Sequence, residues 1–225
     1  MKFNIITLFP DMFKAIKEEG VISRAIKNNI INIDTYQLRN FSNNKYKNID
    51  DKPYGGGRGM VMQVKPIRDC INKIKNNNKN TKIIYLSPQG KRLSHSLILE
   101  LVKEKNITLL CGRYQGVDER IIENDIDMEI SLGDFVVTGG ELPAMLLIDA
   151  ISRQITGVLG NEDSLNDSFA TGMLDYPHYT RPQEIDGQKV PTVLLNGHDE
   201  EIKKWRKLKA LTKTKNKRPD LIVKI

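Results

Sequence analysis

The sequence predicts an α/β fold with a mostly parallel sheet flanked by helices, and three observations predict it. Apolar, β-rich runs alternate with segments of helical periodicity through the first two-thirds of the chain. Runs such as KIIYLS (82–87) and ITLLCG (107–112) are continuously apolar, as in strands covered on both faces. No segment repeats at the period of a solenoid. Alternating elements of this kind form parallel sheets with helices on both sides.

Strands are expected at the apolar runs Phe3–Leu8, Ile30–Leu38, Lys82–Ser87, Ile107–Cys111 and Met128–Leu132. Helices are expected between and after them, where apolar residues recur at three and four positions, at Asp11–Glu19, Val21–Asn28, Pro66–Lys75, Ser94–Lys105, Val117–Glu123 and Glu141–Ile155. The first run is broken by Pro10 and Asp11, and no later run approaches the length of a membrane span. We therefore expect no signal peptide, no membrane segment and a cytoplasmic protein.

The composition changes after Gly160. Residues 161–170 (NEDSLNDSFA) are polar and acidic without apolar periodicity, which is typical of an exposed linker. A hairpin is expected around Asp186-Gly187, followed by a basic helix over Asp199–Lys215. We expect residues 1–159 to form one domain, 160–170 a linker and 171–225 a small, mainly helical second domain. In the basic helix an apolar stripe is expected to be core, namely Ile202, Trp205, Leu208 and Leu211.

The net charge is +7, which favours a polyanionic partner such as nucleic acid. Heavy use of lysine and asparagine by an AT-rich genome gives the same charge without a binding purpose, so both interpretations stay open. With Arg218 beyond it, the basic helix favours phosphate contacts over a merely solvated face. The cysteines, Cys70 and Cys111, lie far apart, which predicts no disulfide framework. His178 and His198 lack partners at metal-ligand spacing, and no metal ligands are predicted.

Three glycine-containing segments each follow a predicted strand: YLSPQG (85–90), CGRYQG (111–116) and LGDFVVTGGELPA (132–144). Ligands of open α/β sheets bind beyond the carboxyl ends of the strands, and glycine lets the backbone approach a ligand closely. Any single segment is explained by a turn or a helix start; the three in order predict a pocket. Neither GxGxxG after the first strand nor GxxxxGK[ST] occurs, which disfavours dinucleotide and triphosphate sites. A pocket of backbone and aliphatic groups suits adenine and a thioether or sulfonium. The glycine-dense PYGGGRGM (53–60) predicts a surface loop, with an anion-binding nest as the alternative.

Eight blocks carry a resemblance to a known family: ITLFPDMF, DDKPYGGGRGM, IYLSPQG, CGRYQGVDERI, GDFVVTGGELPAM, GVLGN, DSFATGMLDYPHYTRP and PTVLLNGH. Their order over nearly the whole chain resembles that of the bacterial tRNA (guanine-N1)-methyltransferases. The resemblance implies a SPOUT-type domain with a trefoil knot, in which the chain around Leu132–Gly140 passes through a loop. It implies a homodimer with an active site shared between subunits. It also implies methyl transfer from S-adenosylmethionine to N1 of guanosine 37 of tRNA, beside the anticodon, which maintains the reading frame.

The family's motifs place the S-adenosylmethionine site on Tyr85, Leu86, Ser87, Pro88, Gly112, Tyr114, Gly116, Leu132, Gly133, Asp134, Phe135, Val136, Val137, Gly139, Gly140 and Pro143. They place the general base at Asp167 in DSF and a supporting arginine at Arg153 in DAISRQI. A carboxylate can take the N1 proton as the methyl group arrives, and a guanidinium can stabilise the charge that moves to O6. Without the resemblance, Asp167 suits a helix cap and Arg153 a surface position.

Three departures from the family pattern are visible. Gln115 stands where the family usually has Glu, Arg58 stands where it has a small residue or proline, and the chain stops soon after KRPDLI, so a shortened second domain is expected. The resemblance implies a Mg²⁺ requirement, although no acidic cluster in the sequence defines a dedicated site. Two rival functions remain: a non-catalytic RNA-binding protein, and a methyltransferase acting on ribose 2′-OH or rRNA. Asp167 and Arg153 disfavour the first, and the DSF and PHYTRP blocks disfavour the second.

Overall fold

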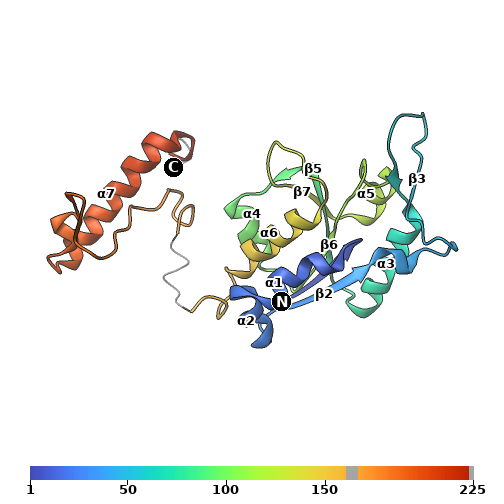
Figure 1. Ribbon diagram of the computed structural model, residues 1–225, viewed down its shortest axis with the longest axis horizontal. Helices are drawn as coiled ribbons and strands as arrows, with labels where there is room; N and C mark the ends of the chain where they lie inside the picture. Colours follow the sequence, from blue (N-terminus) through green and yellow to red (C-terminus); the bar gives the residue numbers. More distant parts are fainter. Residues whose placement is uncertain (161–166, 223–225) are drawn as a thin grey trace. The chain divides into compact units, whose positions relative to one another are not determined.

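The computed structural model describes residues 1–160 and 167–222. The chain divides into two compact units, Met1–Gly160 and Asn161–Ile225. The first unit contains a five-stranded sheet in the order β2-β1-β6-β5-β7, and every strand pairing in it is parallel (Figure 1). The strands are β1 (Lys2–Thr7), β2 (Asn32–Gln37), β5 (Lys82–Arg92), β6 (Asn106–Leu110) and β7 (Met128–Ser131). The predicted parallel α/β sheet is confirmed.

Helices cover both faces of this sheet, as the continuously apolar strands predict. They are α1 (Lys14–Glu18), α2 (Gly20–Lys27), α3 (Val64–Asn77), α4 (His95–Leu101), α5 (Glu119–Asp125) and α6 (Glu141–Ser152). Alternate residues of β5 separate the two halves of the core. Ile84 and Leu86 pack with α2, α4 and α6, whereas Ile83 and Tyr85 pack with α3 and α5. The strand β5 therefore buries side chains on both of its faces, and it pairs with β6 on one side and β7 on the other.

The end of β5 differs from the prediction. The strand is expected to stop at Ser87, but it continues to Arg92 because it pairs with β7 a second time. Leu86 and Lys91 are both paired with Ile130, so residues 87–90 bulge out of the sheet. A side chain on Gly90 would meet the backbone of Glu129 at 2.4 Å, so the bulge returns to β7 at a residue that must lack one.

Two 3-10 helices follow β1 and β2. The first, η1 (Pro10–Phe13), forms the start of the helix expected over Asp11–Glu19, whereas η2 (Leu38–Phe41) and the ribbon beside the sheet escaped prediction. A two-stranded antiparallel ribbon pairs β3 (Asp50–Asp51) with β4 (Val61–Met62), and the glycine-dense segment 53–60 is the loop between them. Gly55, Gly56 and Gly57 all have positive φ, and a Cβ atom added at any of them would meet no other atom within 4 Å. The predicted surface loop is confirmed.

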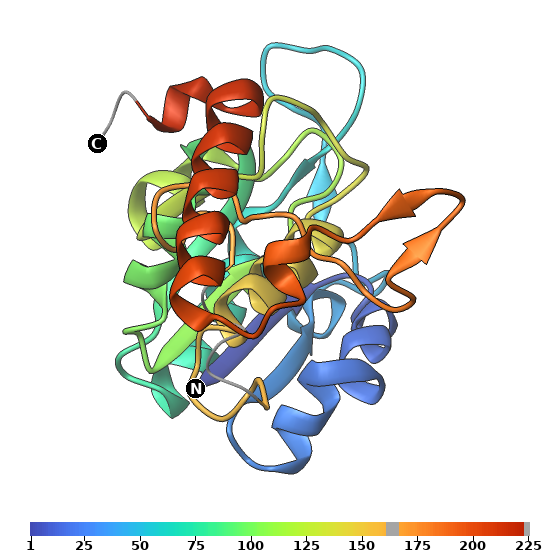
Figure 2. The same cartoon turned by 90° about the vertical axis from the view of Figure 1, so that its left-hand side faces the viewer.

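The second unit carries the predicted hairpin and basic helix. The hairpin pairs β8 (Glu184–Ile185) with β9 (Gln188–Lys189). Asp186 and Gly187 between them both have positive φ, as a two-residue type I′ turn requires. The helix α7 (Asp199–Lys217) lies beside the segment that precedes it, and η4 (Thr192–Leu194) and η5 (Pro219–Leu221) flank the helix (red, Figure 2). In the described residues, no helix is both long and apolar enough to cross a membrane.

One prediction about α7 is wrong. The apolar stripe predicts Leu208 in the core, but its side chain is exposed, whereas Ala210 and Thr214 are the buried residues of this helix. Successive residues of an α-helix are rotated by about 100°, so three-residue steps drift around the axis. Leu208 lies about 200° around the axis from the buried Ala210, on the opposite side, while Ile202, Trp205 and Leu211 are half-buried.

Candidate functional site

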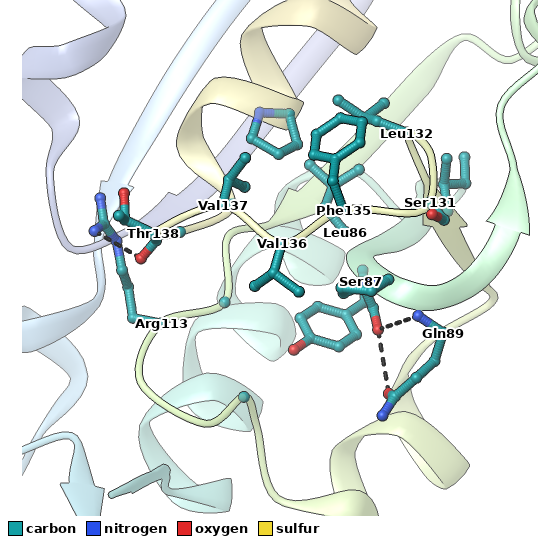
Figure 3. Close-up of a pocket in the computed structure, with 18 of the residues that line it drawn as sticks. Leu86, Ser87, Gln89, Arg113, Ser131, Leu132, Phe135, Val136, Val137 and Thr138 are labelled. Atoms are coloured by element: carbon teal, nitrogen blue, oxygen red, sulfur yellow. Dashed lines mark hydrogen bonds between the residues drawn. The ribbon is translucent and has the colours of Figure 1, made fainter. Parts of the chain in front are cut away.

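A pocket of about 380 Å³ lies beyond the carboxyl ends of β5, β6 and β7. This volume falls within the range of about 300–1,000 Å³ that is usual for small-molecule sites. The pocket is lined by the three loops that the sequence singles out and by the first turn of α6 (Figure 3). Every predicted cofactor residue except Asp134 lines it. The remaining lining residues are Gln89, Arg113, Gln115, Ile130, Ser131 and Thr138.

Asp134 is the predicted residue that does not line the pocket. Its side chain is exposed, and one carboxylate oxygen lies 4.0 Å from Nη1 of Arg92. A separation of this length between two exposed side chains contributes little to stability. Asp134 therefore belongs to the loop 132–140 but does not line the pocket, and its carboxylate lies near Arg92.

Tyr85 and two glycines of the loop after β6 form one side of the pocket. A side chain at Gly112 would lie 2.8 Å from the Tyr85 hydroxyl, and Gly116 has a φ of 115°. Tyr114 between them has a φ of 59°, in the left-handed region. Burial raises the pKa of Tyr85, and the nearby Glu129 carboxylate raises it further, so the phenol stays neutral. The backbone of the loop after β6 thus lies against the tyrosine ring, with no side chain between.

In the loops after β5 and β7, a serine hydroxyl forms hydrogen bonds with the residue two positions further on. The Ser87 hydroxyl accepts from the Gln89 backbone N–H and donates to its Oε1, both at 3.2 Å. The Ser131 hydroxyl accepts from the Gly133 N–H at 3.2 Å and donates to the Gly133 carbonyl at 3.1 Å. The two hydroxyls thus form hydrogen bonds within their own turns. The apolar wall of the pocket is formed by Leu86, Leu132, Phe135, Val136 and Val137 (Figure 3).

An ion pair joins two parts of the pocket. Nη2 of Arg113 lies 2.8 Å from Oε2 of the fully buried Glu141, and Nε donates to the same oxygen at 2.9 Å. The other carboxylate oxygen accepts from the Thr7 hydroxyl at 2.8 Å. Nη1 of Arg113 donates to the Thr138 carbonyl at 3.1 Å. Arg113 therefore links the loop after β6 to α6, to the end of β1 and to the loop 132–140.

Two glycines let the loop 132–140 pass close to the loop after β6. The Gly140 N–H donates to the Gly112 carbonyl at 2.9 Å. A side chain on Gly140 would lie 2.7 Å from the Cys111 Cα, and one on Gly139 would overlap the Arg113 guanidinium. Only glycine fits where backbone meets backbone at this distance. The glycine pair of the sequence is thereby explained by the close approach of two loops.

The glycine-dense loop is attached to the rim of this pocket, which the sequence did not indicate. The side-chain amide of Gln115 donates to the Arg58 carbonyl. The Gln115 backbone N–H donates to the Met60 carbonyl at 3.1 Å, and Met62 N–H donates to the Gly116 carbonyl at 3.0 Å. A glutamate at 115 has no hydrogen to donate to a carbonyl when ionised. The amide of Gln115 therefore suits the contact found here.

The two predicted catalytic residues belong to different units. Arg153 follows α6 as its C-cap, half-buried, and its N–H donates to the Asp149 carbonyl at 3.1 Å. Asp167 is exposed, and its carbonyl accepts from Ala170 N–H at 3.2 Å. Residues 168–173 form turns instead of a helix, so the alternative role of Asp167 as a helix cap has no helix to cap. Among the residues described, no group of His, Cys, Asp and Glu could hold a metal ion.

A parallel sheet covered by helices on both faces, with a pocket beyond its strand ends, defines the class of open α/β proteins, in which small ligands bind at this edge. The family model described as tRNA (Guanine-1)-methyltransferase TrmD matches residues 1–224. The chain belongs to this methyltransferase family.

Curated relatives agree with this assignment. A tRNA (guanine-N(1)-)-methyltransferase of Actinobacillus succinogenes is 52% identical over 100% of this chain and 93% of its own length. One of the same name from Buchnera aphidicola subsp. Schizaphis graminum is 54% identical over 98% of this chain and 84% of its own length. Another from Marinomonas sp. is 50% identical over 99% of this chain and 89% of its own length.

Proposed function

We propose that this protein transfers a methyl group from S-adenosylmethionine to N1 of guanosine 37 in tRNA. The observation that carries the proposal is the match of the family model over residues 1–224, together with one pocket at which all three predicted loops meet. The names of the relatives specify guanine N1 of tRNA as the atom they methylate. Position 37 follows from the family resemblance over nearly the whole chain, and the DSF and PHYTRP blocks disfavour a ribose or rRNA target.

The residues of the pocket fit S-adenosylmethionine. Its apolar wall suits the adenine ring, and Gly112, Gly116 and Gly140 line the pocket with backbone alone, so that no side chain stands between backbone and ligand. When bound, the donor supplies a methyl group on a sulfonium, which is already electrophilic. The protein's residues therefore need to orient the two substrates and exclude water, and the Arg113–Glu141 pair holds the wall in place for this purpose.

Asp167 is proposed as the general base. N1 of guanine carries a proton that must leave before the nitrogen becomes a good nucleophile, and a carboxylate aligned with N1–H can accept it. Removal of the proton moves negative charge toward O6, where the Arg153 guanidinium would donate hydrogen bonds. Because Arg153 and Asp167 belong to different units, their joint action requires the two units to be brought together on the tRNA.

The second unit supplies the proposed tRNA contacts. Basic side chains gather on α7, namely Lys203, Lys204, Arg206, Lys207, Lys209, Lys213, Lys215 and Lys217. Lys209 lies 5.8 Å from the Trp205 ring centroid, and the Tyr179 ring lies 6.4 Å from the same indole. Lysine and arginine side chains suit contacts with tRNA phosphates. Half-exposed aromatic rings suit stacking with bases.

We also propose that the protein forms a homodimer and that its chain is knotted, both of which the family resemblance implies. Leu142 and Leu146 on α6 and Val136 on the neighbouring loop have exposed side chains, an apolar surface that a second copy would bury.

The close passage of Gly139 and Gly140 beside Cys111–Arg113 supports threading of the loop 132–140. The knot would be refuted by an experimental structure in which the traced polypeptide chain becomes straight when its two ends are pulled apart. The family's Mg²⁺ requirement is tested by methyl transfer in EDTA.

The deciding experiment measures methyl transfer to two tRNA transcripts that differ only at position 37, guanosine or adenosine. Wild-type protein is expected to modify only the guanosine transcript, with 1-methylguanosine identified by mass spectrometry. Asp167→Asn is expected to lose about 10²- to 10⁴-fold in rate, the usual contribution of a general base. Asp186→Asn, an exposed acidic residue of the same unit, is the control and should keep full rate. Methylation of a ribose hydroxyl, or tRNA binding without any transfer, would replace the proposal by one of the rival functions.

A further inference from the structure

Residues 169–176, which follow Asp167, contact α7 at two points and Arg218 at its C-terminal end at a third. The Leu174 N–H donates to the Thr214 hydroxyl at 2.9 Å. The Arg206 guanidinium lies 4.9 Å from the Tyr176 ring centroid. Beyond the end of α7, the Arg218 guanidinium lies 5.9 Å from the Phe169 ring. The segment therefore runs alongside the basic helix, as the orange and red ribbons of Figure 2 show.

Thr214 is the buried member of these contacts. Its side chain has no exposed surface, although eight of the residues around it in α7 are basic. Its hydroxyl donates to the Ala210 carbonyl at 2.7 Å and accepts from the Leu174 N–H at 2.9 Å. A valine would occupy the same space but would leave that N–H without an acceptor, at a cost in free energy. The choice of threonine is thus explained by the bond to Leu174 and not by packing.

The attachment at Leu174 extends to Asp167 through a short turn. The Ser168 hydroxyl accepts from the Asp175 N–H at 3.0 Å, next to Leu174. The Phe169 N–H donates to the Met173 carbonyl at 2.7 Å. Phe169 itself has a φ of 77°, which a non-glycine residue adopts only when its surroundings hold it there. These bonds fix the backbone next to Asp167 relative to Leu174, and Thr214 fixes Leu174 relative to α7.

We propose that Thr214 is a positioning residue for methyl transfer: by holding Leu174 on α7 it fixes the turn that presents the Asp167 carboxylate. The proposal rests on the role of Asp167 proposed above. The helix that contacts the tRNA phosphates and the turn that carries the base then move as one body, so docking of α7 also places the carboxylate. A displacement of about 1 Å at a reacting group can cost about 10²-fold in rate.

The test compares Thr214→Val and Thr214→Ser with Thr212→Val. Thr212 is a matched control because it lies two residues away on α7, is exposed, and makes the same hydroxyl bond to the carbonyl four residues before it. Single-turnover methyl transfer is measured with tRNA and S-adenosylmethionine both saturating. We expect Thr214→Val to slow transfer about tenfold or more, since the carboxylate is then misplaced. Thr214→Ser and Thr212→Val should stay within about twofold of wild type, because the first keeps the acceptor and the second keeps Thr214.

Binding measurements separate positioning from a general loss of structure. The dissociation constants for tRNA and for S-adenosylhomocysteine should be unchanged in Thr214→Val, so that only the rate falls. A Thr214→Val protein that binds both ligands and transfers at the wild-type rate overturns the proposal. If that variant does not fold, Ser168→Ala, which breaks the same turn outside the helix, decides in its place by the same rate. Failure of the base assignment is recognised separately, since Asp167→Asn would then keep full rate.

Discussion

Arg113 and Glu141 form an ion pair in which the carboxylate is fully buried and the arginine side chain is 18% exposed, with 2.8 Å between Nη2 and Oε2. The two residues are 28 positions apart in sequence and belong to different elements around the pocket. Because Glu141 is the first residue of α6, its charge also meets the positive end of the helix dipole. One buried carboxylate thus determines where three pocket segments meet.

Replacement of Glu141 by alanine is expected to destabilise the protein by about 3–5 kcal/mol, because Arg113 and the Thr7 hydroxyl lose their partner while remaining enclosed. Urea unfolding measures the loss. The surface pair Lys65–Asp69 is the control, and Asp69→Asn should cost no more than about 1 kcal/mol. Equal losses of unfolding free energy would show that the buried pair contributes no more stability than the surface pair.

Substitution of Gly140 by alanine should weaken binding of the methyl donor. The new methyl group would lie 2.7 Å from the Cys111 Cα and 2.8 Å from the Gly112 nitrogen, so one pocket loop must move. Overpacking of this kind costs about 1–3 kcal/mol, or about tenfold to 10²-fold in affinity if the strain falls on the pocket. Calorimetric titration with S-adenosylhomocysteine tests it, with Gly160→Ala, which meets no atom within 4 Å, as the control. Unchanged affinity in Gly140→Ala would mean that the loops accommodate the added methyl group without altering the pocket.

The buried thiol of Cys70 should make the protein less stable in alkali. Burial raises the pKa of Cys70 from its ordinary value of 9.0 to about 12. Between these values the unfolded thiol loses its proton and the folded thiol keeps it, so unfolding releases a proton and stability falls with rising pH. The slope is about 1.4 kcal/mol per pH unit above pH 9. Urea unfolding under reducing conditions at pH 8 to 10.5 should show a steeper decline for wild type than for Cys70→Ala. Parallel curves would exclude the effect.

Introducing charge on the exposed apolar face of α6 should shift the protein toward monomer. Leu146 is 51% exposed and Leu142 is 55% exposed, one helical turn apart. A glutamate at either position would be buried without a partner in a dimer, at a cost of several kcal/mol. Sedimentation velocity should show a dimer for wild type and mostly monomer for Leu146→Glu. Ile185→Glu, on the exposed hairpin of the second unit, should leave the dimer intact. A dimeric Leu146→Glu protein would place the interface elsewhere.

The sheet and the pocket were predictable because they depend on local patterns. A continuous apolar run such as 82–87 indicates a strand covered on both faces, and its end is followed by a glycine-containing loop. Parallel strands then bring such loops to one edge without further information. The individual cofactor residues were assigned from the family resemblance, and all of them except Asp134 line the pocket.

What escaped prediction depends on contacts between distant residues. Glu141 carries no mark in the sequence that distinguishes an acidic helix start from a buried ion pair with Arg113. The bond of Gln115 to Arg58 spans 57 positions, and no pattern in either segment indicates it. The prediction for Leu208 is wrong because α7 buries the side that carries Ala210 and Thr214, and Leu208 lies on the opposite side.

The bulge in β5 limits how the length of this chain can change. Residues 87–90 are enclosed between two pairings of the same strands, Leu86 with Ile130 before them and Lys91 with Ile130 after them. A single inserted residue would shift the second pairing and turn Lys91 and Arg92 to the opposite face of the sheet. The loop around Gly55–Gly57 and the hairpin at Asp186-Gly187 lie in open space and have no such constraint. Insertions and deletions accepted during evolution should therefore collect at those two places, while the distance in sequence from Leu86 to Lys91 stays fixed.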